Sequence, residues 1–219
     1  MTYQNIYQAR EAVVDACNQM TKLGINQGTS GNISLRYDDI MLISPSGIPY
    51  ENMEPGDVVE MKMDGEWQAS KGMLPSSEWR FHLDILKNKP AVNAVVHAHP
   101  TYCTTLAIMN KPIPAIHYMI AVGGKNTIPC APYATYGTAE LSEYALAALR
   151  DHHACLLANH GMIATGNSLE KAMWTALEVE VLARQYHGCL QIGEPVILPD
   201  DEIDRVLKKW GEYGLREAK

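Results

Sequence analysis

Apolar residues recur along this chain at two spacings, which predict helices and short strands. Between residues 7 and 23 they fall three and four positions apart, which predicts an amphipathic helix that ends at Gly24. Other helical patterns and strand-like runs follow along the chain. We predict helices over 77–89, 101–109, 139–149, 169–186 and 201–210, and strands over 33–37, 40–44, 58–63, 92–99, 118–122, 128–130, 154–159 and 162–165.

The order of these elements bears on the fold class. Several predicted strands follow one another with no helix between them, which disfavours a doubly wound parallel sheet. The order favours a mixed or mainly antiparallel sheet with helices on its faces. No repeat, low-complexity tract or long polar linker interrupts the 219 residues. We therefore expect one α/β or α+β domain over residues 1–219.

Charge and cysteine content narrow the class of protein. The chain has 18 basic and 25 acidic residues and a net charge of −7, which argues against a nucleic-acid-binding or membrane-binding surface. The five cysteines include no C-x-x-C pair, which predicts free thiols in a reducing cytoplasm and no cysteine zinc site. The sequence shows no secretion signal and no run of 18 apolar residues, so we expect a cytoplasmic protein.

The strongest chemical signal is His97-Ala98-His99, at the end of an apolar run. Side chains two residues apart on a strand point to the same face, roughly 7 Å apart along it. Two imidazoles on a buried face need a polar partner, because burying an unpaired polar group is costly. A metal ion bound by both rings would be such a partner.

Two further residues extend this candidate metal site. Glu78 follows paired serines at the predicted start of a helix, and His160 ends a strand-like run, a place where functional residues concentrate. Each has an ordinary explanation alone, since a helix N-terminus favours a carboxylate and a histidine can lie beside a turn. Three imidazoles and one carboxylate together suit zinc.

Three segments rich in glycine, serine and threonine form a second group, at 28–32, 44–47 and 75–77. None is a nucleotide-binding motif and none contains lysine, which disfavours nucleotide hydrolysis. Their hydroxyl and backbone N–H groups suit phosphate oxygens, although each segment alone could be an ordinary turn. Because the third segment directly precedes Glu78, we predict a phosphorylated small molecule bound beside a metal.

The sequence gives little support for other chemistry. No G-x-S-x-G elbow is present, and Cys103 has no evident activating base apart from the histidines already considered. The remaining histidines are interpreted as structural or surface groups: His82, His117, His152, His153 and His187.

Four segments together carry a resemblance to a known family. They are Gly-Thr-Ser-Gly-Asn at 28–32, Pro-Ser-Ser-Glu-Trp at 75–79, His-Ala-His at 97–99 and Asn-His-Gly at 159–161. With these and the segments 113–120, 128–134 and 213–216, the chain resembles the class II aldolase/epimerase family of sugar phosphates from about residue 10 to 216. Ser44 and Ser46 stand where threonines are familiar, and Tyr136 where phenylalanine is. These departures bear on the aldehyde pocket and not on the metal ligands.

The resemblance implies an α/β/α three-layer fold around a central, mainly antiparallel sheet, and a homotetramer with active sites at subunit interfaces. It implies reversible aldol cleavage of a phosphorylated ketose, L-fuculose 1-phosphate, to dihydroxyacetone phosphate and L-lactaldehyde. One Zn²⁺ per subunit would be held by Glu78, His97, His99 and His160. The phosphate would be held by Thr29, Asn32, Ser46, Gly47, Ser76 and Ser77.

The same resemblance suggests catalytic roles. Zinc can act as a Lewis acid for the negative charge that forms when a proton is removed beside a ketone. Substrate oxygens would displace Glu78 from the zinc, and its carboxylate would then act as the base. We predict that Tyr118, with Tyr213 from a neighbouring tail, handles the proton on the oxygen of the cleaved bond. Simple packing is the alternative for both tyrosines.

Other readings stay open at this point. An L-ribulose-5-phosphate 4-epimerase on the same scaffold typically has aspartate after the paired serines, where this chain has Glu78. A methylthioribulose-1-phosphate dehydratase would share the histidine pattern. A zinc-stabilised binding protein without turnover is the alternative from a different class. The serines beside Glu78 argue against it, because a structural zinc site is closed.

Overall fold

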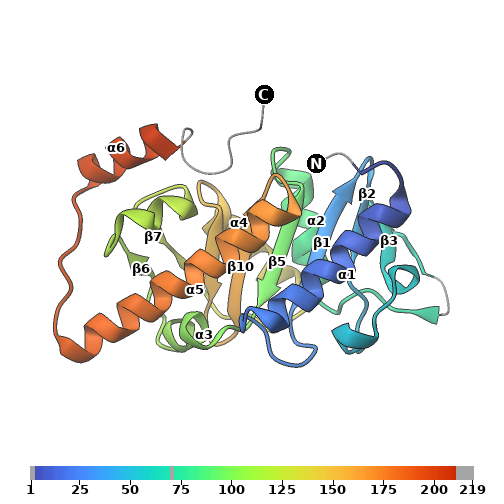
Figure 1. Ribbon diagram of the computed structural model, residues 1–219, viewed down its shortest axis with the longest axis horizontal. Coiled ribbons are helices and arrows are strands. Elements are labelled where there is room, and N and C mark those ends of the chain that lie inside the picture. The colour runs from blue at the N-terminus through green and yellow to red at the C-terminus, as the bar shows by residue number, and fades with distance from the viewer. Residues whose placement is uncertain (1–2, 70–71, 211–219) are drawn as a thin grey trace.

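The computed structural model describes residues 3–69 and 72–210, and an eight-stranded sheet forms its centre (Figure 1). The strand order is β4-β3-β2-β1-β5-β10-β9-β8, and every neighbouring pair is antiparallel except β8 and β9. The strands are β1 (Asn32–Tyr37), β2 (Ile40–Ile43), β3 (Val59–Lys62), β4 (Trp67–Gln68), β5 (Ala94–Ala98), β8 (Cys130–Ala131), β9 (Ala154–Leu157) and β10 (Gly161–Gly166). A separate two-stranded sheet pairs β6 (Ile113–Pro114) with β7 (Thr127–Ile128).

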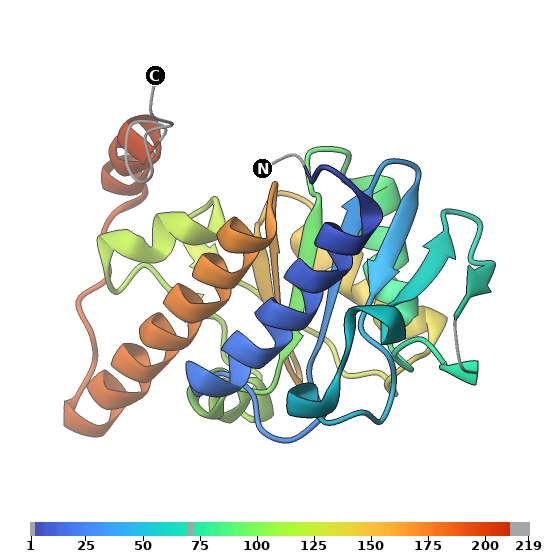
Figure 2. The same cartoon turned by 45° about the vertical axis from the view of Figure 1, so that its right-hand side comes forward.

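Helices cover both faces of the central sheet (Figures 1 and 2). One face packs against α1 (Ile6–Lys22), α3 (Thr101–Ile108) and α5 (Leu169–Ile192), and the other against α2 (Trp79–Asn88) and α4 (Ala139–Leu149). Each face has its own cluster of buried apolar side chains, so the predicted α/β/α arrangement with a mainly antiparallel sheet is confirmed. The other helical elements are α6 (Asp200–Trp210) and the 3-10 helices η1 (Tyr50–Asn52), η2 (Pro55–Asp57) and η4 (Tyr118–Gly123).

The helices begin where the sequence supplies caps. The side chain of Asn5 accepts the N–H of Gln8 at the start of α1, and the side chain of Ser168 accepts the N–H of Lys171 at the start of α5. Helix α5 continues past its predicted end at residue 186 to Ile192. None of the helices in the described part of the chain is long and apolar enough to cross a membrane.

One predicted element is wrong. Residues 118–122 were expected to form a strand, but they form the 3-10 helix η4. The ring Nδ1 of His117 accepts the N–H of Met119 at its start, and Gly124 ends it in the left-handed region at φ 82°. These two local signals at the ends outweigh the strand-like apolar run between them.

Strand register places the three predicted histidine ligands together at the ends of two central strands, β5 and β10. Asn32 of β1 lies opposite His97 of β5, and Ala98 of β5 lies opposite Met162 of β10. His99 follows β5 directly, and His160 directly precedes β10. The antiparallel pairing of β5 with β10 therefore brings together three histidines that are up to 63 positions apart in the sequence.

Candidate active site

Four side chains that the sequence suggested as metal ligands converge in the structure. Glu78, His97, His99 and His160 each offer one ligand atom, and these atoms all lie within 4.8 Å of one another. Nε2 of His97 lies 2.9 Å from Nε2 of His99 and 3.1 Å from Oε2 of Glu78. The three imidazole rings pack edge to face, with centroids 4.8 to 4.9 Å apart.

Hydrogen bonding fixes the orientation of the His97 ring. Its Nδ1 lies 2.9 Å from the carbonyl oxygen of Met162, which can only accept, so Nδ1 carries the proton and donates. In the neutral ring Nε2 is then a bare acceptor, and it faces the other ligand atoms of the cluster. A histidine that donates one ring nitrogen to a backbone carbonyl and presents the other to a site is the usual arrangement of a metal ligand.

One carboxylate oxygen in the cluster lacks a hydrogen-bond donor within the described part of the chain. Oε1 of Glu78 is buried and receives no hydrogen bond from any residue that the structure describes, although Nε2 of His160 lies 3.2 Å away. A cation among the four side chains would satisfy this oxygen and the ring nitrogens that face it together. The residues present therefore fit a divalent metal ion.

The surroundings also set the protonation of the cluster. Burial acts to raise the pKa of Glu78, but attraction to His97 and His160 outweighs it, and the pKa lies well below its usual value. Burial, followed by repulsion from His97 and His160, lowers the pKa of His99 to about 4. Near neutral pH the carboxylate is therefore charged and His99 is neutral, which are the forms that bind a metal.

The position of Glu78 differs from the sequence expectation. The helix predicted over 77–89 would place Glu78 in its first turn, but Glu78 itself is the N-cap residue. Oγ of Ser76 accepts the N–H of Glu78 at 3.3 Å, and the carbonyl of Ser76 accepts the N–H of Trp79 at 3.0 Å. Because of this tight turn the helix starts at Trp79, two residues later than predicted, and the Glu78 side chain is free to face the histidines.

Glycine is required immediately after His160. A Cβ added to Gly161 would lie 2.6 Å from the carbonyl oxygen of Ala98 and 2.6 Å from Cδ2 of His99, closer than real contacts of this kind. Asn159 on the other side of His160 has a left-handed backbone, with φ at 54°. The Asn-His-Gly segment thus turns tightly against β5 and places His160 and His99 side by side.

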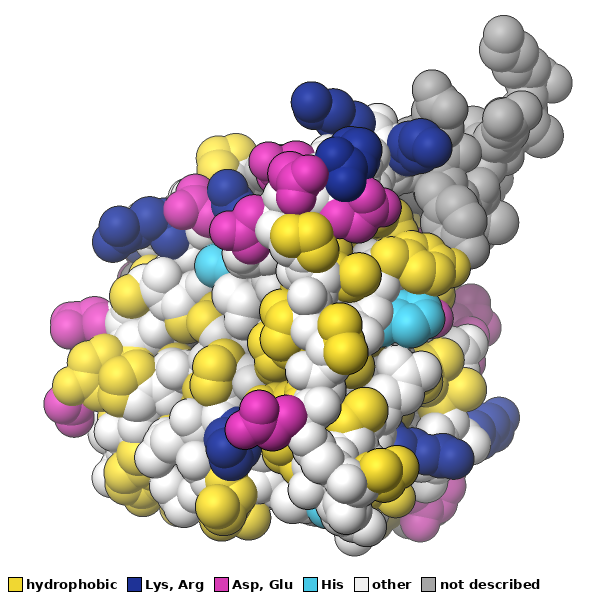
Figure 3. All heavy atoms as spheres, turned by 90° about the vertical axis from the view of Figure 1, so that its left-hand side faces the viewer, with side chains coloured by type: hydrophobic (Ala, Val, Ile, Leu, Met, Phe, Trp, Pro, Cys, Tyr) yellow, Lys and Arg dark blue, Asp and Glu magenta, His cyan; other side chains and the backbone are white. Residues whose placement is uncertain are grey.

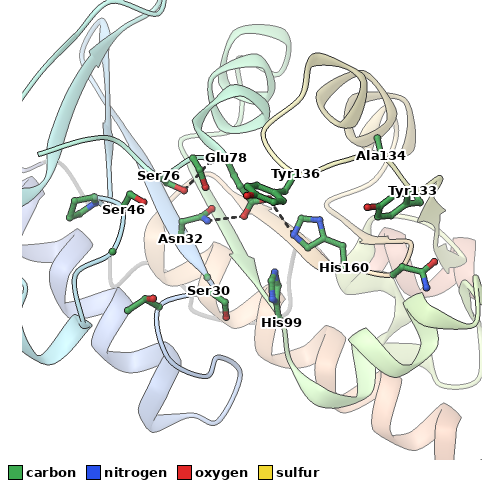
Figure 4. A pocket seen from close by; sticks show the side chains of 16 residues that line it. Ser30, Asn32, Ser46, Ser76, Glu78, His99, Tyr133, Ala134, Tyr136 and His160 are labelled. Carbon is green, nitrogen blue, oxygen red and sulfur yellow. Dashed lines mark hydrogen bonds and ion pairs between the residues drawn. The ribbon is translucent and has the colours of Figure 1, made fainter.

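A pocket of about 330 Å³ opens over the cluster (Figure 4). Glu78, His99 and His160 lie in its lining, whereas His97 is fully buried beneath them. All six residues suggested for phosphate binding also line it: Thr29, Asn32, Ser46, Gly47, Ser76 and Ser77. A pocket of this size accommodates a small metabolite.

The glycine- and serine-rich loops are tied to one another by backbone contacts. The N–H of Ser46 donates to the carbonyl of Leu74 at 2.9 Å, and the N–H of Ser76 donates to the carbonyl of Ser44 at 3.1 Å. The Ser44 hydroxyl, which we expected among the anion-binding groups, instead accepts the N–H of Ile33 at 3.1 Å. Two of the three loops therefore form one continuous wall of the pocket.

The opposite wall was largely missed by sequence reasoning. It contains Tyr133, Ala134, Tyr136 and Asn159, of which only Tyr136 had been connected with the pocket. Tyr133 and Tyr136 are 60% and 66% exposed. Asn159 could have been predicted to line the pocket because it directly precedes His160 in the sequence.

Of the two tyrosines suggested for proton transfer, the structure describes only Tyr118. Tyr118 begins η4, is 43% exposed and is absent from the pocket lining among the described residues. Tyr213 lies outside the described residues.

Comparison with known proteins adds to this geometry. Residues 11–187 match the model of the family described as Class II Aldolase and Adducin N-terminal domain. The chain is 55% identical over 205 residues to an L-fuculose phosphate aldolase of Escherichia coli O6:H1, with 93% of this chain and 94% of the relative covered. It is 54% identical over 205 residues to a 5-methylthioribulose-1-phosphate/5-deoxyribulose-1-phosphate aldolase of Rhodospirillum rubrum, with coverage of 94% and 92%.

A solved structure is also similar. The structure of an L-fuculose 1-phosphate aldolase matches with a TM-score of 0.90 and 37% identity, and the match covers 96% of this chain and 98% of that one.

Proposed function

The chain belongs to the family of class II aldolases and adducin N-terminal domains, and from this premise we propose that it is a metal-dependent aldolase for L-fuculose 1-phosphate. The products of reversible cleavage are dihydroxyacetone phosphate and L-lactaldehyde. The observation that carries the proposal is the convergence of Glu78, His97, His99 and His160 in a pocket walled by serine-rich loops. The chain acts as one class II aldolase/epimerase-like domain over residues 1–219.

The resident metal in this proposal is one zinc ion per subunit. The orientation of His97, whose Nε2 faces the cluster, the neutral ring of His99 and the unsatisfied Oε1 of Glu78 support it. When bound, zinc would supply Lewis-acid stabilisation of the negative charge on the ketone oxygen.

Glu78 serves as the base for the carbon acid. In the condensation direction it takes a proton from carbon 3 of dihydroxyacetone phosphate, and the electron pair of that bond passes toward the ketone oxygen. In the cleavage direction the same carboxyl group returns the proton. Its strongly lowered pKa keeps it ionised before the substrate arrives, and its place in the pocket lining gives it access to the substrate.

The serine-rich wall holds the phosphate group. The binding groups are the side chains of Thr29, Asn32, Ser46, Ser76 and Ser77 and the backbone N–H of Gly47, all of which line the pocket. Because the chain has a net charge of −7, attraction of an anionic substrate depends on such local donors and on the metal.

A homotetramer with active sites at subunit interfaces accompanies this function. Tyr118 begins η4 and is not among the described residues that line the pocket. In the proposed assembly it would act on the pocket of a neighbouring copy, with Tyr213, and handle the proton on the oxygen of the cleaved bond. Exposed apolar side chains at the end of α5 and beyond it offer a contact surface, and Figure 3 shows hydrophobic side chains on the face that carries this end of the molecule. The exposed apolar residues of this segment include Leu190, Ile192, Val196 and Ile197. The five free cysteines support a cytoplasmic location.

A second substrate is favoured by one specific observation. The relative named for 5-methylthioribulose 1-phosphate and 5-deoxyribulose 1-phosphate is 54% identical, almost as similar as the relative named for L-fuculose phosphate. These ketose 1-phosphates share the half that becomes dihydroxyacetone phosphate and differ at the aldehyde end. The epimerase and dehydratase alternatives find less support, because both of these relatives are named as aldolases.

The testing experiment measures release of dihydroxyacetone phosphate from L-fuculose 1-phosphate and from 5-deoxyribulose 1-phosphate. L-Ribulose 5-phosphate is assayed in parallel for epimerisation. We expect cleavage of the first substrate with the highest kcat/KM, a fall to below about 1% of the activity on dialysis against a chelator, and recovery with zinc. Full activity in the presence of chelator would refute the metal mechanism, and preference for 5-deoxyribulose 1-phosphate would select the second substrate.

A further inference from the structure

A buried row of polar side chains lies behind Glu78, between β1 and α2. Nδ2 of Asn32 lies 3.1 Å from Oε2 of Glu78, and Oδ1 of Asn32 lies 2.5 Å from Nε2 of His82. Nδ1 of His82 lies 2.7 Å from Oγ of Ser34. His82 and Ser34 have no exposed surface, and Asn32 is 4% exposed.

The row results from two regular spacings. Asn32 and Ser34 are two residues apart on β1, so their side chains point to the same face of the sheet. Glu78 and His82 are four residues apart at the start of α2, so they lie on the same side of the helix. Packing α2 on this face of the sheet interleaves the two pairs into the order Ser34, His82, Asn32, Glu78.

The direction of every hydrogen bond in the row is determined. The carboxylate of Glu78 can only accept, so Asn32 must turn its NH₂ group toward Glu78 and its carbonyl oxygen toward His82. That oxygen also only accepts, so Nε2 of His82 carries the proton. Burial is the main cause that lowers the pKa of His82 to about 3, so the ring is neutral and Nδ1 accepts from the Ser34 hydroxyl.

We propose that His82 and Ser34 are positioning residues for Glu78, and that they act by locking the amide of Asn32. The proposal rests on the function proposed above, in which Glu78 is both a metal ligand and the base. If the Asn32 amide turned over, its carbonyl oxygen would face the Glu78 carboxylate and repel it. The donor from His82 prevents this, and Ser34 keeps His82 in the tautomer that can donate.

Packing alone does not require a histidine here. The neighbours of His82 on α2 that face the same cluster are Phe81, Leu83, Ile85 and Leu86, and an apolar residue would bury equally well among them. A buried imidazole is costly unless both nitrogens are bonded, and the two partners of His82 form a row that ends on the metal cluster.

The test compares His82→Leu, His82→Gln and Ser34→Ala with the unmodified protein. Ser142→Ala is the matched control, because Ser142 is a buried serine that bonds to Asp84 of α2 without touching the row. The readouts are thermal stability, zinc affinity by competition with a chelator, and exchange of the carbon 3 proton of dihydroxyacetone phosphate in D₂O followed by NMR. The last two report separately on Glu78 as ligand and as base.

We expect His82→Leu to weaken zinc binding and to slow the exchange at saturating dihydroxyacetone phosphate, each about 10- to 100-fold, with little change in KM. His82→Gln should retain most of the zinc affinity and most of the exchange rate, because the glutamine amide can donate to Oδ1 of Asn32. Ser34→Ala should lower zinc affinity and the exchange rate less than His82→Leu does. Ser142→Ala should change neither quantity.

Two results with the His82 variants would overturn the proposal. One is a folded His82→Leu protein with unchanged zinc affinity and exchange, and the other is a His82→Gln protein as impaired as His82→Leu. If His82→Leu does not fold, Ser34→Ala decides the question, since wild-type zinc affinity and exchange in that variant would equally refute it. Absence of exchange in the unmodified protein would refute the proposed function. The zinc affinities of the variants would still test whether His82 and Ser34 position Glu78.

Discussion

The two ends of the pocket differ in how firmly their side chains are held. At the metal end His97 is fully buried, Glu78 and Asn32 are each 4% exposed, and the hydrogen-bonding groups behind Glu78 have determined directions. At the other end Tyr133 and Tyr136 are 60% and 66% exposed. We therefore expect the chemistry to depend on the buried end and, in the proposed function, the choice of aldehyde to depend on the exposed end.

Glu78→Gln tests the rigid end and should have the largest effect. The amide cannot act as a base, so we expect kcat to fall about 10²- to 10⁴-fold, while the three histidines still retain zinc. Steady-state kinetics and the zinc content of the purified variant measure the two effects. Glu60→Gln is the control, since Glu60 is ion-paired with Arg10 outside the pocket lining. Near-normal turnover with zinc bound would remove Glu78 from the role of base.

Ser46→Ala tests the phosphate wall and should have an intermediate effect. Loss of one hydrogen bond to a charged group costs about 1.5–3 kcal/mol, so we expect KM for L-fuculose 1-phosphate to rise about 10-fold or more with a smaller change in kcat. Ser30→Ala is the matched control, because Ser30 also lines the pocket but its hydroxyl already donates to the carbonyl of Gln27 at 2.9 Å. An equal rise in KM for both variants would contradict a specific role of Ser46.

Tyr136→Phe tests the open end and should have the smallest effect. An exposed neutral hydroxyl contributes about 0.5–1.5 kcal/mol at most, so we expect the ratio of kcat/KM for L-fuculose 1-phosphate and 5-deoxyribulose 1-phosphate to change about three- to tenfold. Zinc content should be unchanged. Tyr144→Phe is the control, because the Tyr144 hydroxyl bonds to Glu140 on the surface of α4. A loss as large as that of Glu78→Gln would show that the two ends do not differ as described.

The candidate metal-binding residues could be predicted from the sequence because polar, metal-binding residue types are unusual in an apolar strand. Two imidazoles in an apolar strand have few structural explanations, and Glu78 beside paired serines added a second chemical group. The regular spacings of apolar residues marked most helices and strands, and their order favoured a mainly antiparallel sheet, whereas the three-layer arrangement was implied by the resemblance to a known family. The resemblance to a known family supplied the residues that we propose bind phosphate, and the structure shows only that they line the pocket.

What the sequence concealed depends on contacts between distant segments. His82 reads as one polar residue within an amphipathic helix, and Ser34 as one hydroxyl in a strand, so neither signals a role until α2 lies on β1. The turn that makes Glu78 the cap of α2 likewise depends on local hydrogen bonds of Ser76 that residue preferences do not specify. In the 118–122 segment the caps decided the structure, whereas the apolar pattern suggested a strand.

The backbone bonds between the two serine-rich loops have a consequence for the thermodynamics of ligand capture. Because Ser46 and Ser76 are already paired with the partner loop, the wall needs no ordering when an anion arrives. The entropic cost of closing a loop is thus met during folding and not during association. We expect inorganic phosphate to bind in a single kinetic phase, with an association rate that falls as ionic strength rises and shows no slow rearrangement afterwards.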